Sequence, residues 1–238
     1  MKYGEKFIFS GFLIGGLLGF IAGKILFENI YFSFITTIIF GIFFSKQFIE
    51  YFKKKRKRKF LNQFCDFLDS ISTSLSCGKN SYYAFLNADM EMQALFNVNE
   101  PICVVTKEIV KGMEEGKTIE ELLYNIAEES GCQEVKTFAM IYSIGVQTGG
   151  NLKEIVDKSR NTIVDKIMLE DEIETMLIAP KNELNIMMVM PLIMVSMLKV
   201  TGNTETMNKE ISIIVNLIAF SMFMISYIIG RKMVDIEI

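Results

Sequence analysis

The feature that most restricts the possible folds of this 238-residue chain is a set of four stretches without a charged residue. Two lie toward its start, at residues 7–23 and 30–45, and two lie toward its end, at residues 184–198 and 211–230. A helix that crosses the hydrocarbon core of a bilayer needs about 20 predominantly apolar residues. Only the last stretch reaches that length alone, and the others reach it with flanking residues whose long side chains extend to the membrane surface. The sequence therefore predicts two transmembrane helical hairpins.

Lysine and arginine set the orientation of such spans, because loops rich in them stay in the cytoplasm. If all four stretches cross the cytoplasmic (inner) membrane, every rich basic cluster falls on one side, so both termini and residues 46–183 are cytoplasmic. A cleaved signal peptide at residues 7–23 is the alternative, although a second apolar stretch follows at once. The predicted organisation is an N-terminal transmembrane hairpin (1–45), a basic juxtamembrane segment (46–59), a cytoplasmic helical domain (60–183), a C-terminal transmembrane hairpin (184–230) and a cytoplasmic tail (231–238).

Seven consecutive basic residues follow the second apolar stretch: Lys53, Lys54, Lys55, Arg56, Lys57, Arg58 and Lys59. Residues 46–59 hold eight basic residues and one acidic residue, which gives a net charge of +7. Residues 60–183 hold ten basic and 21 acidic residues, which gives a net charge of −11. Because the basic run adjoins a predicted span, it predicts contact with anionic lipid headgroups, at about 1 kcal/mol per charge. Nucleic acid is the alternative ligand, but the acidic domain would repel a phosphate backbone, so we predict no nucleic-acid partner.

Between the spans, apolar residues recur every three or four positions, which predicts helices and leaves no competing strand pattern. Helix starts are predicted at residues typical of caps and first turns: Asn80, Pro101 and Thr118. Helix ends are predicted at or near glycines: Gly78, Gly112, Gly131 and Gly149. The last helix begins at Leu152 and is expected to run for about 25 residues, ending near Leu177. The predicted fold class is all-α: an integral membrane protein whose two transmembrane hairpins flank a cytoplasmic six-helix bundle.

Several kinds of chemistry are excluded by composition. The chain has no histidine, which removes Ser-His-Asp and Cys-His catalysis and histidine metal sites. The segment from Gly112 to Thr118 resembles a phosphate-binding loop, but three residues rather than four separate Gly112 from Gly116, and a helix pattern precedes it. Paired carboxylates such as Glu120 and Glu121 are interpreted as solvated helix faces. We therefore predict no catalytic residue, cofactor or metal site, and no enzyme.

Glycines mark two features with possible packing roles. In the first apolar stretch, glycines spaced by four residues line one helix face, which favours close helix packing in membranes: Gly11, Gly15, Gly19 and Gly23. Farther along, Gly149, Gly150 and Asn151 form the most pronounced turn signal of the chain. Two glycines free the backbone between two predicted helices, so this segment predicts a tight helical hairpin without by itself indicating a function.

At this point the chain resembles a known family. The helix pattern with Phe64, Phe67, Leu68 and Ile71 is similar to the first helix of the type II secretion system F domain, and the segment from Val146 to Leu152 is the most specific part of the likeness. The resemblance covers about residues 60–195 and is strongest to the TadB-like platform proteins of tight-adherence (Flp-type) pilus assembly, which carry one F domain. Its characteristic turns map onto Gly78, Gly112, Gly116, Gly149, Gly150 and Asn151.

The resemblance implies a non-enzymatic platform in the cytoplasmic membrane that couples a cytoplasmic secretion or pilus ATPase to the extraction and polymerisation of pilin or pseudopilin. It also implies a second F-domain platform protein as a partner, and a homo-oligomer. Two alternatives share the composition: a membrane-anchored helical scaffold, and a transporter permease subunit that binds a different ATPase. The permease is disfavoured because the four apolar stretches carry no acidic or basic residue that would mark a transport path.

Overall fold

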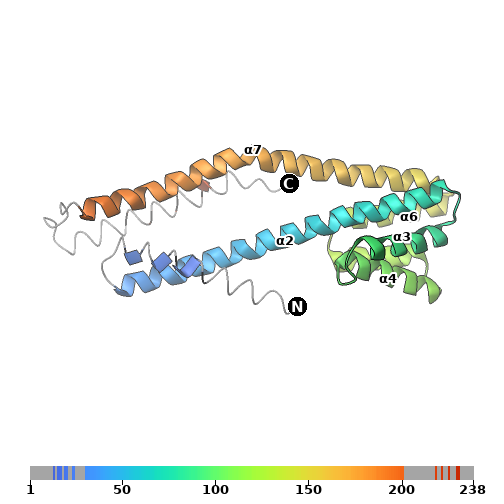
Figure 1. Cartoon of the computed structure of the whole chain (residues 1–238), viewed down its shortest axis with the longest axis horizontal. Coiled ribbons are helices and arrows are strands. Elements are labelled where there is room, and N and C mark those ends of the chain that lie inside the picture. The colour runs from blue at the N-terminus through green and yellow to red at the C-terminus, as the bar shows by residue number, and fades with distance from the viewer. Residues whose placement is uncertain are drawn as a thin grey trace. The chain divides into compact units, whose positions relative to one another are not determined.

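A computed structural model describes residues 30–200, together with residues 13, 15–17, 19, 20, 23, 24, 218, 221, 225, 229 and 230. These residues form α-helices joined by short turns and contain no β-strand (Figure 1). In chain order, the helices whose limits are described are α2 (Ile30–Ser76), α3 (Ser81–Leu95), α4 (Pro101–Glu114), α5 (Ile119–Ser130), α6 (Gln133–Thr148) and α7 (Leu152–Val200). The predicted all-α class is confirmed.

The chain divides into two compact units. One comprises residues 1–53 and 170–238, and the other, which we call the bundle, comprises residues 54–169. Helices α2 and α7 each contribute to both units, because the divisions fall within them. The bundle therefore contains six helical segments: the second part of α2, all of α3 to α6, and the first part of α7.

No helix in the part of the chain that the structure describes combines the length and the hydropathy required to cross a membrane. The apolar stretch at residues 30–45 lies in α2, and that at residues 184–198 lies in α7. The stretches at residues 7–23 and 211–230 fall mostly outside the described residues. The four crossings therefore remain a prediction.

The starts of three bundle helices follow from local side-chain chemistry. The Oδ1 atom of Asn80 accepts a hydrogen bond of 3.0 Å from the N–H of Tyr83, and Thr118 Oγ1 accepts one of 3.4 Å from the N–H of Glu121. Each bond satisfies a backbone donor that has no partner inside its helix. Pro101 is the first residue of α4, where its missing N–H costs no hydrogen bond. All three predicted starts are confirmed.

Helix α4 ends two residues beyond the predicted position near Gly112. The helix continues to Glu114, and the left-handed residue that follows it is Gly116, with a φ of 84°. Gly112 is buried inside the helix, where a Cβ atom would lie 2.3 Å from Cδ2 of Leu122. This glycine therefore allows α4 to pack closely against α5. The other predicted ends are confirmed, because glycines of positive φ follow α2, α5 and α6: Gly78, Gly131 and Gly149.

The predicted length of the last helix is also wrong. Helix α7 has 49 residues and continues past Leu177 to Val200. Pro180 and Pro191 lie within it without ending it. Each proline removes one backbone donor, but the flanking residues are mainly leucine, isoleucine, methionine, glutamate and lysine, most of which are good helix formers.

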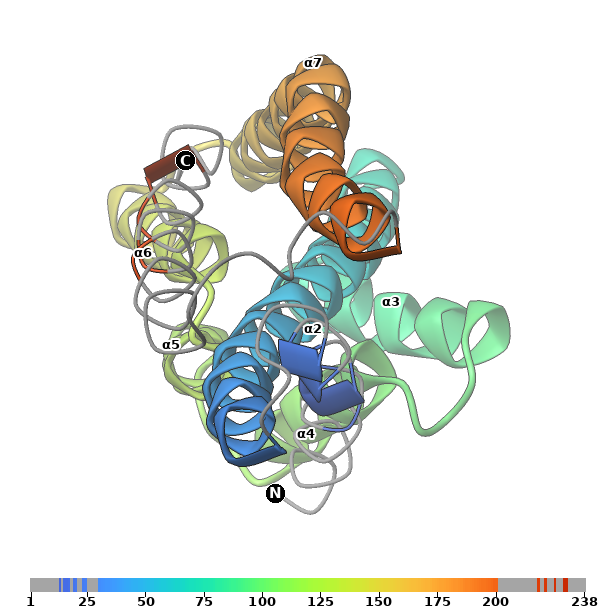
Figure 2. The ribbon, with the colours of Figure 1, turned by 90° about the vertical axis from the view of Figure 1, so that its left-hand side faces the viewer.

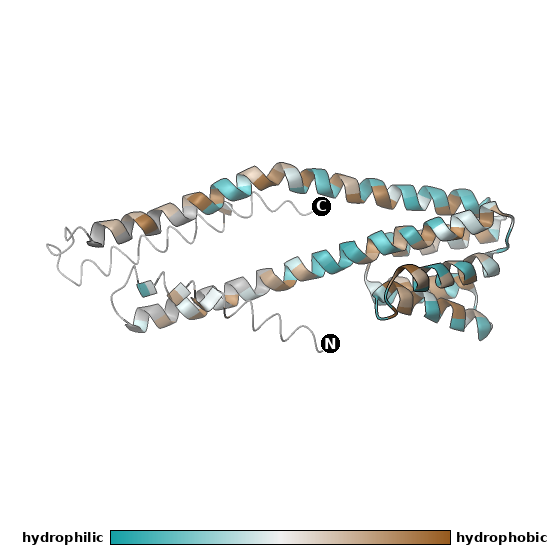
Figure 3. Cartoon of the chain, in the orientation of Figure 1, coloured by the Kyte–Doolittle hydropathy of each residue, from teal (hydrophilic) through white to brown (hydrophobic). Residues whose placement is uncertain are grey.

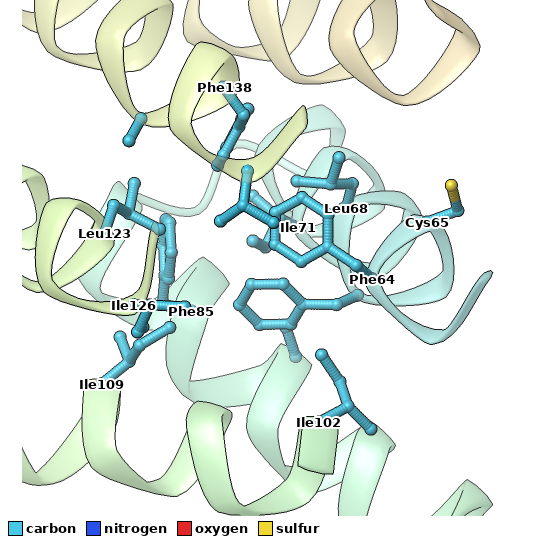
Figure 4. Packing of buried hydrophobic residues seen from close by; sticks show 14 of the residues in the cluster. Phe64, Cys65, Leu68, Ile71, Phe85, Ile102, Ile109, Leu123, Ile126 and Phe138 are labelled. Carbon is cyan, nitrogen blue, oxygen red and sulfur yellow. The ribbon is translucent and has the colours of Figure 1, made fainter. Parts of the chain in front are cut away.

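The core of the bundle forms around one apolar stripe of α2. Phe64 and Phe67 are each 1% exposed, and their rings contact different helices. The Phe64 ring lies 5.7 Å from that of Phe138 in α6, and the Phe67 ring lies 5.8 Å from that of Phe85 in α3, both edge-on. Figure 4 shows side chains from α2, α3, α4, α5 and α6 converging on this stripe. Burial of each large side chain contributes about 1.5–3 kcal/mol, so the stripe organises the bundle.

The remaining helices pack in pairs. Helix α3 lies beside α4, and α5 lies beside α6 (Figure 2). Helix α7 completes the core with three buried side chains: Val156, Ile163 and Ile167. Short turns join each neighbouring pair of helices, which is the expected arrangement of an antiparallel bundle.

Truncation of the core stripe should destabilise the bundle. Leu68 is fully buried, so Leu68→Ala should lower the free energy of unfolding of the bundle by about 2–5 kcal/mol through lost burial and a cavity. The exposed Asn62 on the same helix is the matched control, and Asn62→Ala should change it by less than about 0.5 kcal/mol. The measurement is the temperature at which the buried Cys103 becomes reactive to a thiol reagent, in a chain whose exposed Cys77 is serine. Equal temperatures for both variants would contradict this account of the core.

Candidate functional site

A tight turn sets the relation between α6 and α7. Gly149 has a φ of 66°, in the left-handed region that favours glycine. The N–H of Gly150 donates to the carbonyl of Gly145 at 2.8 Å, and the N–H of Gly149 donates to the carbonyl of Val146 at 3.3 Å. This pair of bonds is the Schellman arrangement that closes a helix end. Asn151 then caps α7, because its Oδ1 accepts a bond of 3.4 Å from the N–H of Glu154. The structure thus brings together the three predicted turn residues.

Gly145 is also part of this site, although it is not among the predicted turn residues. It is buried on α6, where a Cβ atom would lie 2.2 Å from Cδ1 of Ile155 and 3.3 Å from Cδ2 of Leu152. The absence of a side chain at Gly145 therefore allows α6 and α7 to pack closely just before the turn. A glycine four residues ahead of a terminal glycine, inside an apolar helix pattern, is the signal that would have identified it.

A groove of about 560 Å³ runs between α6 and α7 and is lined mainly by apolar surface. Isoleucine and phenylalanine side chains supply that surface, and polar side chains from both helices flank it. Its lining residues are Gln133, Glu134, Thr137, Phe138 and Ile141 from α6, and Asn151, Glu154, Ile155, Lys158, Ser159, Thr162, Ile163 and Lys166 from α7 and its cap.

One wall of the groove holds a buried carboxylate. The side chain of Glu134, in the first turn of α6, is 7% exposed. Lys166 of α7 donates to its Oε1 atom at 2.6 Å. Lys57 of α2 donates to the same atom at 3.4 Å and lies 3.3 Å from Oε2, which accepts no hydrogen bond from the residues described. A single acidic side chain therefore joins three helices of the bundle.

Two further polar contacts join α2 directly to α7. Ser72 donates a hydrogen bond from its Oγ atom to Oδ1 of Asp157. One turn along each helix, the Nε atom of Arg160 lies 3.7 Å from Oδ1 of Asp69. The first part of α7 is thus held to α2 by both contacts and to α6 by Glu134.

The family model for Type II secretion system (T2SS), protein F, matches residues 67–198, which is more than half of the chain. This chain belongs to the type II secretion system protein F family. No curated protein and no solved structure matches it. The family resemblance inferred from the sequence is confirmed. The matched range contains the α6–α7 turn, the groove and Glu134, whereas Lys57 and the rest of the basic run lie before it.

Electrostatics keep the buried carboxylate of this protein F chain ionised. Burial acts to raise the pKa of Glu134, but the hydrogen bond from Lys166 and the positive charges of Lys57 and Lys166 outweigh it, so the pKa lies below its ordinary value of 4.5. Glu134 is therefore an anion at neutral pH. Its geometry suits it to hold helices together rather than to exchange protons.

In the described part of the chain, no three or more Cys, Asp or Glu side chains are arranged to hold a metal ion. Burial raises the pKa of Cys65 to about 11 and also raises the pKa of Cys103 and Cys132. These thiols are protonated near neutral pH and are therefore weak nucleophiles. Burial, followed by the neighbouring Asp69, raises the pKa of Asp66 as well. The arrangement provides a groove between α6 and α7, beside the point where Glu134 joins α2, α6 and α7.

The remaining predicted site residues fall on two helical segments. Gly15, Gly19 and Gly23 are buried, and Gly11 lies outside the described residues, so close packing by this face remains a prediction. The basic run, from Lys53 to Lys59, lies entirely on α2 and forms a hydrophilic band on that helix (Figure 3). Its lipid contacts also remain a prediction.

The stability of the bundle should depend on pH through Glu134. Because the pKa of the folded state is below the ordinary value, the carboxylate contributes stability above about pH 4.5, and this is lost as the pH falls through the lowered pKa. Glu134→Gln removes this contribution. When the pH is lowered from about 6 to about 3.5, the unfolding temperature of the variant should therefore fall less than that of the parent chain. Labelling of the buried Cys103 with dithiodipyridine, which reacts with thiols in acid, measures that temperature.

The matched control for this prediction is Glu128→Gln, which removes an exposed carboxylate from α5. At neutral pH, Glu134→Gln should lower the free energy of unfolding by about 1–2 kcal/mol, because the amide keeps one acceptor oxygen but loses the negative charge that pairs with Lys57 and Lys166. Glu128→Gln should change it by almost nothing. If Glu134→Gln and Glu128→Gln have the same pH profile, Glu134 does not carry the acid sensitivity.

Proposed function

We propose that this protein is a platform of a type II secretion or type IV (tight-adherence) pilus assembly machine in the cytoplasmic membrane. In this proposal it couples a cytoplasmic ATPase to the extraction and polymerisation of pilin or pseudopilin subunits. Membership of the protein F family supports the general role. The TadB-like branch is the more specific assignment, and the single F-type domain of the sequence supports it.

The membrane location is part of the proposal. Four uncharged stretches, two of them inside α2 and α7, support two transmembrane hairpins. The positions of lysine and arginine support cytoplasmic termini and a cytoplasmic segment 46–183. In this arrangement each long helix connects the bundle to an apolar stretch.

The observation that best supports coupling is the continuity of α7. This helix begins at the α6–α7 turn and extends without interruption from the bundle to Val200, through the apolar stretch at residues 184–198. At 1.5 Å per residue, 49 residues span roughly 70 Å. A helix resists bending because its backbone hydrogen bonds run along its axis, so rotation or tilt at one end is carried to the other. The contacts of Glu134, Asp157 and Arg160 hold its first part to the bundle.

Affinity purification of the tagged chain from its native membrane should identify the machine. We expect recovery of a secretion-type ATPase, a second F-domain platform protein, and pilin or pseudopilin. An untagged chain processed in parallel is the control. Reproducible recovery of a different transport ATPase, without any secretion component, would overturn the platform assignment in favour of a permease or scaffold.

Interruption of α7 should uncouple the bundle from pilus formation or secretion. A seven-residue Gly-Ser insertion after Ile178 breaks helical continuity, whereas a seven-residue Ala-Glu-Lys insertion adds about two helical turns and keeps the faces of the helix aligned. The Gly-Ser variant should lose pilus formation or secretion, and the helical variant should retain much of it. Both must reach parental levels in the membrane. Equal output from the two variants would show that α7 does not transmit the motion.

A further inference from the structure

The seven consecutive basic residues of α2, from Lys53 to Lys59, do not share one environment. Lys57 is in contact with the buried Glu134, and Lys59 donates to Oε1 of Glu100 at 2.6 Å. Glu100 is the N-cap residue of α4 and also accepts a bond of 3.4 Å from Gln63. The end of the basic run thus holds α6 and α4 against α2.

The middle of the run is different. Three adjacent side chains are exposed, and none of them forms an ion pair with a residue that the structure describes: Lys54, Lys55 and Arg56. Successive residues of an α-helix are about 100° apart, so these three point outward over more than half of the circumference of α2. Their charge is available to a ligand outside the chain.

We propose that Lys54, Lys55 and Arg56 bind the phosphate groups of anionic phospholipids, whereas Lys57 and Lys59 are positioning residues that hold the bundle helices. The inference rests on the proposed membrane location of the apolar stretch at residues 30–45. It assigns three residues of the run to lipid binding and two to the structure of the bundle.

Distances along α2 support this division. A span of about 20 residues that begins at Ile30 ends near Glu50. Residues 54–56 then lie about 6–9 Å farther along the axis, where the headgroup layer is about 5–8 Å thick. The long side chains of lysine and arginine reach back along a helix toward phosphates, and arginine binds phosphate through two parallel hydrogen bonds. Lys57 and Lys59 lie about 10–14 Å beyond the span, past this layer, where they meet acidic side chains of the bundle instead.

Charge complementarity favours a lipid as the occupant. Residues 60–183 carry a net charge of −11, so an anionic membrane surface would repel the domain that α2 carries. Basic residues placed at the headgroup layer offset that repulsion locally. A polynucleotide is the weaker candidate, because it would extend beyond the basic band and meet the acidic bundle.

Native mass spectrometry of the full chain in detergent, titrated with phosphatidylglycerol or phosphatidylcholine, tests the proposal. The parent chain should retain phosphatidylglycerol preferentially. The triple variant K54Q/K55Q/R56Q should bind it at least about tenfold more weakly, with an unchanged temperature for labelling of the buried Cys132. The double variant K57Q/K59Q should show the opposite result: retained phosphatidylglycerol and a lower labelling temperature.

Three outcomes would overturn the proposal. The triple variant could retain phosphatidylglycerol at the parental level, the double variant could lose as much of it as the triple variant, or inorganic phosphate at millimolar concentration could displace it from the parent chain. Alkaline carbonate extraction of native membranes tests the membrane location separately from the lipid site. If the chain is washed off, both the membrane location and the lipid site fail; if it stays in the membrane and the triple variant keeps its lipid, only the lipid site fails.

Discussion

The carboxylate of Glu134 is buried between lysines from two other helices, and the relation of α2, α6 and α7 within the bundle depends on it. A buried charge is costly unless it is paired and hydrogen-bonded. Here Lys57 and Lys166 supply both the opposite charge and the donors, at 3.4 Å and 2.6 Å from the same oxygen. Apolar packing alone tolerates small shifts between helices, whereas a shared acceptor requires both lysines to stay in place. The ion pairs therefore add a specific polar contact among α2, α6 and α7 to the apolar packing around them.

This constraint gives α7 a fixed starting point. Its first turn is capped by Asn151 directly after the Gly149 turn, and Lys166 is held four turns later, so the helix is secured over that whole length. Gly145 brings α6 close to the same segment. A helix secured at several points moves with the bundle as one body. Helix α7 continues from this segment to Val200, which is the continuity on which the proposed coupling role rests.

Local features of this chain could be predicted from the sequence, and features that depend on distant residues could not. Asn80, Thr118 and Gly149 act on backbone groups within a few residues, so their roles follow from short-range chemistry. Gly112 has the same residue type as a helix terminus, but its role depends on Leu122 across a helix interface. The pairing of Lys57 with Glu134 joins residues 77 positions apart, and no spacing rule indicates it. Helix α7 is longer than predicted, because Pro180 and Pro191 lie within it without ending it.

The same long-range pairing explains why a uniform run of basic residues has two kinds of environment. In the sequence, Lys53 to Lys59 are equivalent, because each is a cation next to an apolar stretch. In the fold, the acidic residues of the bundle are within reach of Lys57 and Lys59 only after α4 and α6 have packed on α2. Folding of the bundle therefore pairs Lys57 and Lys59 with acidic side chains. It leaves Lys54, Lys55 and Arg56, which come earlier in α2, exposed without an ion pair to a described residue. The division of the run is thus a consequence of tertiary packing, and it places the exposed cations on the side of the apolar stretch.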